Sequence, residues 1–310
     1  MLDGALCPVL HFLKIPMFWQ TTRFRLDLSR PLVMGIVNVT PDSFSDGGQH
    51  ATTETAIAHC EQLVKDGADI LDIGGESTRP GAQPLPTAEE LDRVLPVLRA
   101  ALTLGVAVSV DTYKPQVMRA ALELGADIIN DVWSLRWQDP HGGPVGEDLV
   151  AGHASCGVCL MHMHREPVTM QVAPMDGDVV PQVRAFLVER AQALQMRGVA
   201  AERITLDPGI GFGKTVQQNF SLLARQSELL DAGFPILAGW SRKSSLAAVT
   251  QTSLGSVARM DVQERVVPSV TAALLSVQNG ARVVRVHDVK ETVQALKVWA
   301  ATQAEARASA

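Results

Sequence analysis

The sequence predicts a single α/β domain, a (β/α)8 or TIM barrel with its active site at the C-terminal ends of the strands. Short apolar or β-branched runs recur along the chain, and each is followed by a stretch of helical periodicity. The runs are almost continuously apolar, as in a parallel sheet covered by helices. Eight such units, joined by right-handed crossovers, close most simply into a barrel. The alternative is a doubly wound open sheet, which typically has about five to seven strands and a topological switch point.

The expected elements follow one another without a linker. The strands are expected at 31–39, 70–75, 107–112, 127–132, 157–163, 203–209, 235–241 and 282–288. The clearest helical stretches are 52–67, 87–105, 114–125, 179–198 and 267–280. Several of these end at a glycine, which can adopt the left-handed backbone conformation of a helix C-cap. Residues 134–148 predict only an irregular connection.

The length and composition predict a soluble globular protein of enzyme size with a large core. The chain has 310 residues, 46% of them hydrophobic and 19% charged, and a formal net charge of −6. This charge leaves no cationic stripe for nucleic acid, so an anionic ligand must be held by a local cluster. No apolar run reaches the roughly 18 residues of a membrane span, so we expect neither nucleic acid nor a membrane as partner.

The two ends of the chain are expected to lie outside the barrel. The opening segment is apolar, but Asp3 stands where a signal peptide has positive charge, and Lys14 and Pro16 interrupt the run. We therefore expect an irregular leader over residues 1–22, with Met17 as an alternative start. The barrel is expected over 23–303 and a tail over 304–310.

The cysteines indicate a reducing compartment rather than a disulfide framework. There are four, at positions 7, 60, 156 and 159, and we expect a cytoplasmic protein. Cys156 and Cys159 have the C-x-x-C spacing, but a redox motif of that kind opens a helix, whereas this pair runs into an apolar strand. Buried small side chains are the favoured interpretation.

Polar side chains stand at the C-terminal end of nearly every expected strand. They are Asn38, Glu76 to Arg79, Asp111, Asn130, His162, Asp207, Ser241 to Lys243, Arg285 and His287. Taken singly, each has a structural explanation, because an aspartate can cap a helix, an asparagine can close a turn and a lysine can be solvated. Together they are better explained by the one face on which barrels place their chemistry.

Two further patterns in this region are ambiguous. The glycine-rich stretch DPGIGFGKT, 207–215, fails the P-loop spacing at Pro208 and the G-x-G-x-x-G spacing at Lys214, so its glycines more simply allow close backbone approach. His162 and His164 are two apart on one strand face, as metal ligands can be. Without a third ligand, a hydrogen-bonded pair is favoured over zinc.

These motifs together resemble dihydropteroate synthase, a family of pterin-binding TIM barrels, along residues 27 to about 300. The matching stretches, in order, are GIVNVTPDSFSDGG, LDIGGESTRPGA, SVDTYKP, ADIINDV, VCLMHM, LDPGIGFGK, GWSRKS and RVHDVKET. The resemblance implies a transferase of folate biosynthesis. It would join 6-hydroxymethyl-7,8-dihydropterin diphosphate to p-aminobenzoate, releasing pyrophosphate and 7,8-dihydropteroate, with sulfonamides as competitive mimics of p-aminobenzoate.

The resemblance also implies a role for each matching residue. The pterin pocket would contain Asp111, Asn130, Met161, Asp207 and Lys243. The diphosphate would contact Asn38, Thr78, Arg79, Arg285 and His287, with Mg²⁺ as cofactor and Asn38 as its protein ligand. The p-aminobenzoate would contact Ser43, Phe44, Thr78, Arg79, Pro80, Phe212 and Ser244. The catalytic set would be Asn38, Asp42, Arg79, Lys243, Arg285 and His287.

The implied mechanism is dissociative. Pyrophosphate leaves first, a pterin methylene cation forms, and the neutral aniline nitrogen attacks it, with Asp42 steadying the cation. Such a reaction needs charge stabilisation on the leaving group and exclusion of water. A homodimer is implied by the family alone.

The chain departs from the family pattern at Ile210 and Trp240, which we expect beside the aminobenzoate region, and in SRKSSLA after Ser244. The alternatives are a pterin-binding methyltransferase of the same barrel class and a non-catalytic pterin-binding homologue. The first would lack the STRP loop and the SRKS and RVHD combination, and the second would have lost Lys243, Arg285 or Asn38. A glycosidase is disfavoured because no acid/base carboxyl pair stands apart from the pterin-type set.

Overall fold

The computed structural model describes residues 17–39, 48–77, 83–166, 169–170, 172–250 and 261–308. Its centre is a sheet of eight parallel strands in the order β8-β7-β6-β5-β4-β3-β10-β9. A parallel bridge between Leu206 and Ile236 joins the two outermost strands, so the sheet closes into the predicted barrel. The strands are β3 (Leu32–Asn38), β4 (Ile70–Gly74), β5 (Ala107–Asp111), β6 (Ile128–Asp131), β7 (Gly157–Met161), β8 (Ile204–Asp207), β9 (Leu237–Ala238) and β10 (Val283–Val286). Each lies within an expected range, and the doubly wound sheet is excluded.

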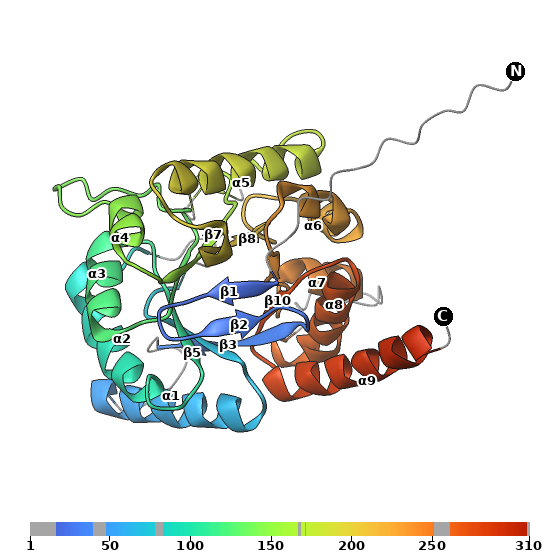
Figure 1. Cartoon of the computed structure of the whole chain (residues 1–310), viewed down its shortest axis with the longest axis horizontal. Coiled ribbons are helices and arrows are strands. Elements are labelled where there is room, and N and C mark those ends of the chain that lie inside the picture. Colours follow the sequence, from blue (N-terminus) through green and yellow to red (C-terminus); the bar gives the residue numbers. More distant parts are fainter. Residues whose placement is uncertain are drawn as a thin grey trace, which may run out of the picture.

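Helices surround the barrel (Figure 1). They are α1 (Gly48–Lys65), α2 (Thr87–Ala101), α3 (Pro115–Leu124), α4 (Gly146–Gly152), α5 (Val179–Met196), α6 (Val216–Ala224), α7 (Ser244–Thr250), α8 (Val266–Gln278) and α9 (Val289–Ala308). Short 3-10 turns occur at η2 (Ala201–Arg203), η3 (Gln226–Ala232) and η4 (Gln263–Arg265).

Local sequence sets several of these helix ends. Helix α3 starts with Pro115, whose fixed φ suits the first turn, and stops at Gly125 in the left-handed conformation. Helix α6 starts with a capping box, in which Thr215 and Gln218 each accept the other's backbone N–H. The expected helices are therefore confirmed, and α4 is an additional helix that begins inside the stretch 134–148.

A β-hairpin precedes the barrel and closes its N-terminal end. Strands β1 (Phe18–Gln20) and β2 (Arg25–Asp27) pair antiparallel and lie across the barrel (Figure 1). Trp19 is fully buried, and its indole N–H donates to the carbonyl of Arg203 at 3.0 Å. The expectation of an irregular segment up to residue 22 is therefore wrong from Met17 onward, because Trp19 anchors this segment to the core.

The C-terminal boundary also differs from the expectation. Helix α9 runs through the expected tail as far as Ala308, because its Ala-rich sequence has high helix propensity. Residues 1–16 lie outside the described part of the chain. The assignment of the barrel to one domain over 23–303 stays a prediction.

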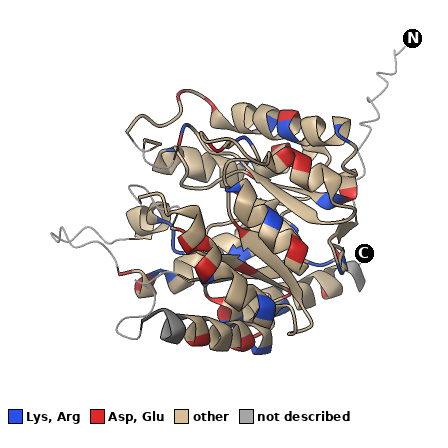
Figure 2. Cartoon of the chain, turned by 90° about the vertical axis from the view of Figure 1, so that its left-hand side faces the viewer, with Lys and Arg blue, Asp and Glu red and all other residues tan. Residues whose placement is uncertain are grey.

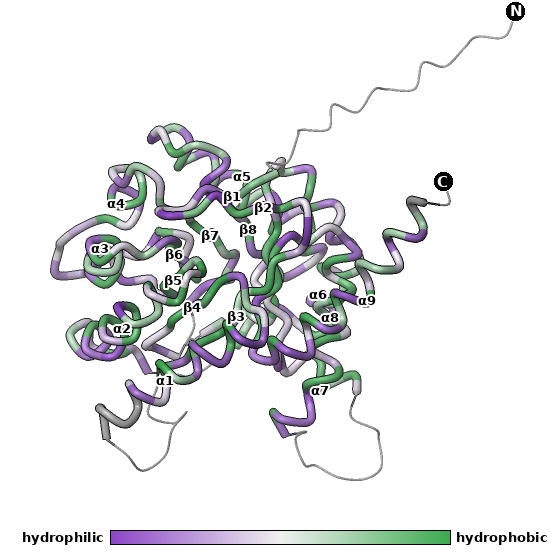
Figure 3. Tube along the Cα trace, turned by 60° about the horizontal axis from the view of Figure 1, so that its bottom comes forward, coloured by the Kyte–Doolittle hydropathy of each residue, from purple (hydrophilic) through white to green (hydrophobic). Residues whose placement is uncertain are grey.

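Alternate strand residues face opposite sides of the barrel wall. Along β5, Val108 and Val110 pack outward with the helices, whereas Ala107 belongs to the cluster that fills the N-terminal half of the interior. Figure 3 shows the strands largely in the colour of hydrophobic residues, and Figure 2 shows the charged residues concentrated on the outer helices. Among the described residues, no helix is long and apolar enough to span a membrane.

The cysteines of the described chain are structural. Cys60, Cys156 and Cys159 are buried and carry free thiols. Burial raises the pKa of Cys60 to about 12, and it raises the pKa of Cys156 and Cys159 as well. The C-x-x-C pair is therefore confirmed as two buried side chains and has no thiolate for redox chemistry.

Candidate active site

The C-terminal ends of the strands bring polar side chains together at one mouth of the barrel. Asp111 of β5 is the register partner of Asn130 of β6, and Met161 of β7 is the partner of Asp207 of β8. Arg285 of β10 reaches from the opposite part of the wall. Every second side chain of a strand points into the barrel, and these residues are at inward-pointing positions. Their side chains therefore converge on the barrel axis.

Arg285 is the centre of this group. Its Nε donates to Asp72 at 2.6 Å, and a terminal nitrogen donates to Asp111 at 2.6 Å. Asn130 donates to the same Asp72 oxygen at 3.1 Å. Burial lowers the pKa of Arg285, but Asp72 and Asp111 outweigh it, and the net pKa is raised. The guanidinium is therefore permanently charged and held in a fixed plane.

Burial has the opposite effect on the carboxyl groups of the mouth. It raises the pKa of Asp111, against the opposing effect of Arg285. It also raises the pKa of Asp207, which accepts the backbone N–H of Gly209 at 2.7 Å, with Lys243 opposing. These two acids lie in a desolvated place where a ligand with matching N–H groups would stabilise their charge.

Asp72 was not among the residues predicted from the sequence. It lies inside the apolar run ILDIG of β4 and is completely buried, and its second carboxylate oxygen has no partner among the described residues. A single acid in the middle of an apolar run marks the position in the sequence, because buried carboxylates are retained when paired, but the sequence does not identify the partner.

The glycine-rich loop after β8 packs against the end of β7. Gly209, Gly211 and Gly213 all have positive φ. A Cβ at Gly209 would lie 1.8 Å from the carbonyl oxygen of His162, and one at Gly213 would lie 2.5 Å from Cβ of His164. The glycines therefore allow a close backbone approach, as predicted, and here the approach is to the neighbouring strand end.

Lys243 and Phe212 form the next part of the wall. The Lys243 ammonium lies 4.3 Å from the centroid of the Phe212 ring, a cation–π distance. Phe212 belongs to an apolar cluster at the mouth with Tyr113, Val132, Met161, Met163 and Met170, against which Trp133 and Trp137 pack. This cluster places buried apolar side chains beside the charged groups.

His287 and Ser241 close the mouth on the β9 and β10 side. The Ser241 hydroxyl lies 2.9 Å from His287 Nδ1 and accepts the His287 backbone N–H at 3.1 Å. Arg242 forms an ion pair with Asp288 at 2.6 Å, which joins the same two strand ends. The imidazole is therefore fixed from its Nδ1 side.

His162 pairs with Lys214 instead of His164. The Lys214 ammonium lies 2.9 Å from His162 Nδ1, and both side chains are buried. Within the described ranges, no group of three His, Cys, Asp or Glu side chains could hold a metal ion.

A second charged cluster lies beneath the end of β4. The Lys114 ammonium donates to Glu76, to Glu90 at 2.6 Å and to the carbonyl of Leu85 at 2.6 Å. The Tyr113 hydroxyl donates to the other Glu76 oxygen at 3.0 Å. This cluster fixes both Glu76 and Leu85, the two flanks of the loop that follows β4.

Comparison with known proteins identifies the family. The sequence matches the model of the pterin binding enzymes over residues 34–287. It is 49% identical over 288 residues to the dihydropteroate synthase of Neisseria meningitidis serogroup B, covering 91% of this chain and 96% of that protein. The chain belongs to the dihydropteroate synthase family. It is therefore an enzyme of the transferase class.

Solved structures of the dihydropteroate synthase family have the same fold. The enzyme of Burkholderia cenocepacia, complexed with 7,8-dihydropteroate, has a TM-score of 0.82 at 50% identity, covering 94% of this chain and 99% of that one. The enzyme of Xanthomonas albilineans, with 4-aminobenzoic acid, has a TM-score of 0.81 at 50% identity, covering 90% and 96%. These structures therefore also confirm the prediction of a TIM barrel.

Two departures from the family pattern lie away from the mouth. Ile210 and Trp240 are buried in the cluster between the barrel and its outer helices. The Trp240 ring packs at a tilt against the Phe220 ring, with the ring centroids 5.3 Å apart. Phe212 belongs to the separate cluster at the mouth. The expectation that both departures line the aminobenzoate region is therefore wrong, because these side chains point outward.

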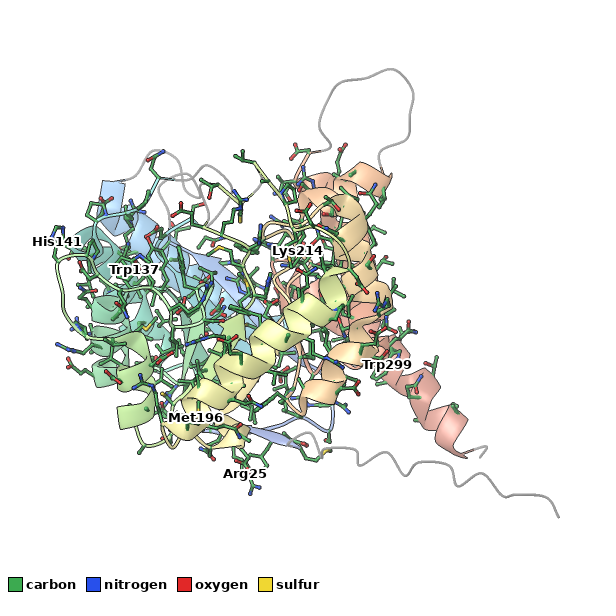
Figure 4. All side chains as sticks on the ribbon, turned by 90° about the horizontal axis from the view of Figure 1, so that it is seen from above. Arg25, Trp137, His141, Met196, Lys214 and Trp299 are labelled. Atoms are coloured by element: carbon green, nitrogen blue, oxygen red, sulfur yellow. The ribbon has the colours of Figure 1, made fainter. Side chains whose placement is uncertain are left out.

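The structure places most of the predicted site residues and leaves others outside the described part. Asn38 is half-buried at the end of β3, and Ser244 is exposed where α7 begins. The predicted residues Asp42, Ser43, Phe44, Thr78, Arg79 and Pro80 lie outside the described residues. In Figure 4, Trp137 and Lys214 lie toward the end of the barrel opposite to Arg25 of the hairpin.

Proposed function

We propose that the chain condenses 6-hydroxymethyl-7,8-dihydropterin diphosphate with p-aminobenzoate to give 7,8-dihydropteroate and pyrophosphate. The observation that carries this proposal is the meeting of Asp111, Asn130, Asp207 and Arg285 at one barrel mouth. Two family members of the same fold bind 7,8-dihydropteroate and 4-aminobenzoic acid, which supports the substrate class.

The buried acids suit the pterin ring. A pterin presents a guanidine-like N–H edge, and a desolvated carboxylate such as Asp207 accepts such an edge in bidentate fashion. Lys243 can donate to the ring carbonyl, and Met161 and Phe212 supply apolar surface beside it. Because burial penalises the ionised form of Asp207, binding of the pterin compensates that cost.

The cations of the mouth suit the leaving group. Asp72 and Asp111 accept from two nitrogens of Arg285, and among the described residues none accepts from its other terminal nitrogen. That nitrogen can donate to diphosphate oxygens. His287, held through Nδ1 by Ser241, can donate from its opposite ring nitrogen. Preorganised donors of this kind stabilise the charge that develops as pyrophosphate departs.

Mg²⁺ fits the donor set of this mouth. The protein offers the Asn38 amide beside the proposed diphosphate position, and no described cluster could hold the ion without the substrate. Magnesium takes few protein oxygens and completes its shell with water and phosphate oxygens. When bound, it would neutralise charge on the diphosphate.

The second substrate meets the aromatic side of the mouth. Phe212 and the exposed Ser244 are the described residues that we assign to p-aminobenzoate. Dissociation of pyrophosphate breaks the C–O bond and leaves a methylene cation. The aniline nitrogen attacks this cation to form the C–N bond and then loses one N–H proton. The surrounding apolar cluster keeps water from competing for the same carbon.

We also propose a homodimer and a cytoplasmic location. Val267 and Leu275 of α8 and Val298 of α9 are 75%, 41% and 68% exposed, and α8 packs beside α9. A contiguous patch of exposed aliphatic side chains marks an interface, and these three lie on neighbouring helices. The free buried thiols suit a reducing compartment. Light scattering after size exclusion will give twice the monomer mass if the dimer forms, and the monomer mass would refute it.

The function is tested by following pyrophosphate release from the pterin diphosphate, with and without p-aminobenzoate and Mg²⁺. We expect release that depends on all three and that a sulfonamide slows in competition with p-aminobenzoate. Lys243→Ala should lose pterin binding while the far-ultraviolet circular dichroism is unchanged. Absence of release at saturating substrates would exclude the proposal.

A further inference from the structure

The Lys214 ammonium is fully buried behind the mouth and serves neither the predicted pterin set nor the predicted diphosphate set. It lies 2.9 Å from His162 Nδ1, and it donates to the carbonyls of Gly209 and Phe212 at 2.8 and 3.1 Å. A longer contact of 3.4 Å reaches the carbonyl of His162. An ammonium group has three N–H donors, and this site supplies an acceptor for each.

Each loop carbonyl bound by Lys214 belongs to a residue that holds a site group. Gly209 donates its N–H to Asp207 at 2.7 Å, so the residue that orients the Asp207 carboxylate is itself fixed by Lys214. Phe212 carries the ring against which Lys243 lies at 4.3 Å. One buried cation therefore fixes both ends of the loop from which the mouth is built.

The remaining partner, His162, is fixed as an acceptor. Burial, with Lys214 adding to it, lowers the pKa of His162 to about 2, so the imidazole is neutral at any working pH. Its Nδ1 then accepts from Lys214, and the proton is on Nε2. Phe186 packs edge-on against the ring at 5.0 Å. Lys214 thus connects the end of β7 to the loop after β8.

We propose that Lys214 is a positioning residue of the condensation reaction, which holds the 207–213 loop against His162 so that Asp207, Phe212 and Lys243 keep their binding geometry. This inference rests on the proposed function, because the loop residues it orients are those assigned there to the pterin and to p-aminobenzoate. Lys214 itself contacts no substrate in this assignment.

Because Lys214 is a titratable group, its positioning of the loop should depend on pH. Burial lowers the pKa of Lys214 to about 7, Lys243 adds to this effect, and Asp207 opposes it. The other charged groups near the pair are Arg136 and His164, which act on His162. Below pH 7 the ammonium fills all three acceptors, and above it the neutral amine has two N–H groups. Positioning should therefore weaken as the pH rises through about 7.

The first test compares steady-state kinetics of wild type, Lys214→Met and Lys65→Met, the last being a matched change at an exposed lysine of α1. Misplacement of a binding loop by about 1 Å can cost about 100-fold, so we expect a 10- to 100-fold rise in KM for the pterin diphosphate in Lys214→Met. A purely structural role would lower only the active fraction and leave KM unchanged. KM within twofold of wild type would overturn the proposal.

Conservative replacement and pH separate positioning from folding. Lys214→Gln retains two N–H donors, so its KM should lie between those of wild type and Lys214→Met. If Lys214→Met does not fold, the KM of Lys214→Gln is compared with wild type instead. In wild type, kcat/KM should fall as the pH rises through about 7, and this limb should be missing in Lys214→Met. An identical pH profile in both proteins would contradict the role.

Two measurements do not depend on activity. In protein labelled with ¹³C at lysine Cε, a resonance that is absent from Lys214→Met should titrate near pH 7. Amide hydrogen exchange of residues 209–213 should be faster in Lys214→Met than in wild type. If wild type releases no pyrophosphate, the proposed function fails while these two results still decide whether Lys214 orders the loop; unchanged exchange would refute that.

Discussion

The two ends of the barrel are built from the same strands and have opposite side-chain chemistry. At the N-terminal end the interior is apolar and is sealed by the hairpin. Its residues are Trp19, Leu28, Leu32, Met34, Ile70, Ala107, Ile128, Cys159, Leu237 and Val283. At the C-terminal end the same strands present Asp111, Asn130, Asp207 and Arg285. The N-terminal end is closed by apolar packing, whereas the C-terminal end carries the polar side chains of the candidate active site.

The difference is one of free energy. Burial of apolar side chains stabilises the N-terminal end, whereas burial of acids at the C-terminal end costs free energy, as the raised pKa of Asp111 and Asp207 indicates. Substitutions at the mouth should therefore reduce activity with little loss of stability. Substitutions at the sealed end should do the reverse.

The largest effect is expected at the mouth, from Asp207→Ala. Loss of the carboxylate leaves the pterin N–H edge unpaired in a desolvated site, which costs about 10⁴-fold in kcat/KM. The melting temperature should change little, because burial already penalises the ionised carboxylate, and this gain is offset by the loss of the acceptor for the Gly209 N–H. Pyrophosphate release and thermal unfolding measure the two quantities, with exposed Asp231→Ala as the control. A large loss of stability would contradict the comparison.

At the sealed end, Trp19→Ala should destabilise the protein by about 4 kcal/mol, since a buried indole leaves a cavity. The hydrogen bond to the Arg203 carbonyl is lost as well. KM for both substrates should not change at a temperature where the variant is folded. Urea unfolding gives the free energy, and Phe18→Ala, at a half-buried neighbour, should lose much less. A raised KM would show that the ends are coupled.

The Lys114 cluster lies between these extremes. Lys114→Met leaves the buried Glu90 and the nearby Glu76 without their cation, which should cost about 3 kcal/mol. Burial already raises the pKa of Glu90. Adding Glu90→Gln should therefore recover part of the loss, and a double-mutant cycle in urea measures the coupling. Additive losses would show that the two side chains act independently.

Sequence reasoning predicted the fold because the signals were periodic and repeated. Each apolar run became a strand of the barrel, and strand geometry alone brought polar residues such as Asn130 and Asp207 to the mouth. The hairpin was missed because three-residue strands carry no period. Only Trp19 indicated a buried segment there.

Within the site, the roles of some residues could not be predicted because they depend on partners far away in the sequence. Asp72 reads as part of an apolar run, and only the approach of Arg285, 213 positions along the chain, explains its charge. Lys214 reads as the end of a glycine loop that follows β8, yet its partner His162 directly follows β7. The direction of Trp240 also follows from tertiary packing alone. Pairing of this kind is a property of the closed barrel rather than of any local stretch.

The smallest effect is expected at Asp131, which follows the mouth residue Asn130 on β6. Its carboxylate accepts the N–H groups of Trp133 and Leu135 at 2.7 and 2.6 Å, and it stabilises a turn in which Leu135 has a φ of 61°. Burial raises the pKa of Asp131 to about 7, against an ordinary value of 3.8. The folded protein therefore binds this proton more tightly than the unfolded chain does.

The sign of the pH effect follows from that difference. Below the pKa of the unfolded chain, Asp131 is neutral in both the folded and the unfolded state, so it does not lower the stability of the fold. As the pH rises from about 4 to about 7, the unfolded chain ionises first and stability falls, reaching a plateau above 7. Asp131→Asn does not titrate, so its stability relative to wild type should improve between pH 5 and pH 8, by on the order of 2 kcal/mol. Urea unfolding of both proteins at the two pH values measures this change. Parallel pH profiles would mean that Asp131 is already ionised at pH 5, and that hydrogen bonding from the turn outweighs burial at this position.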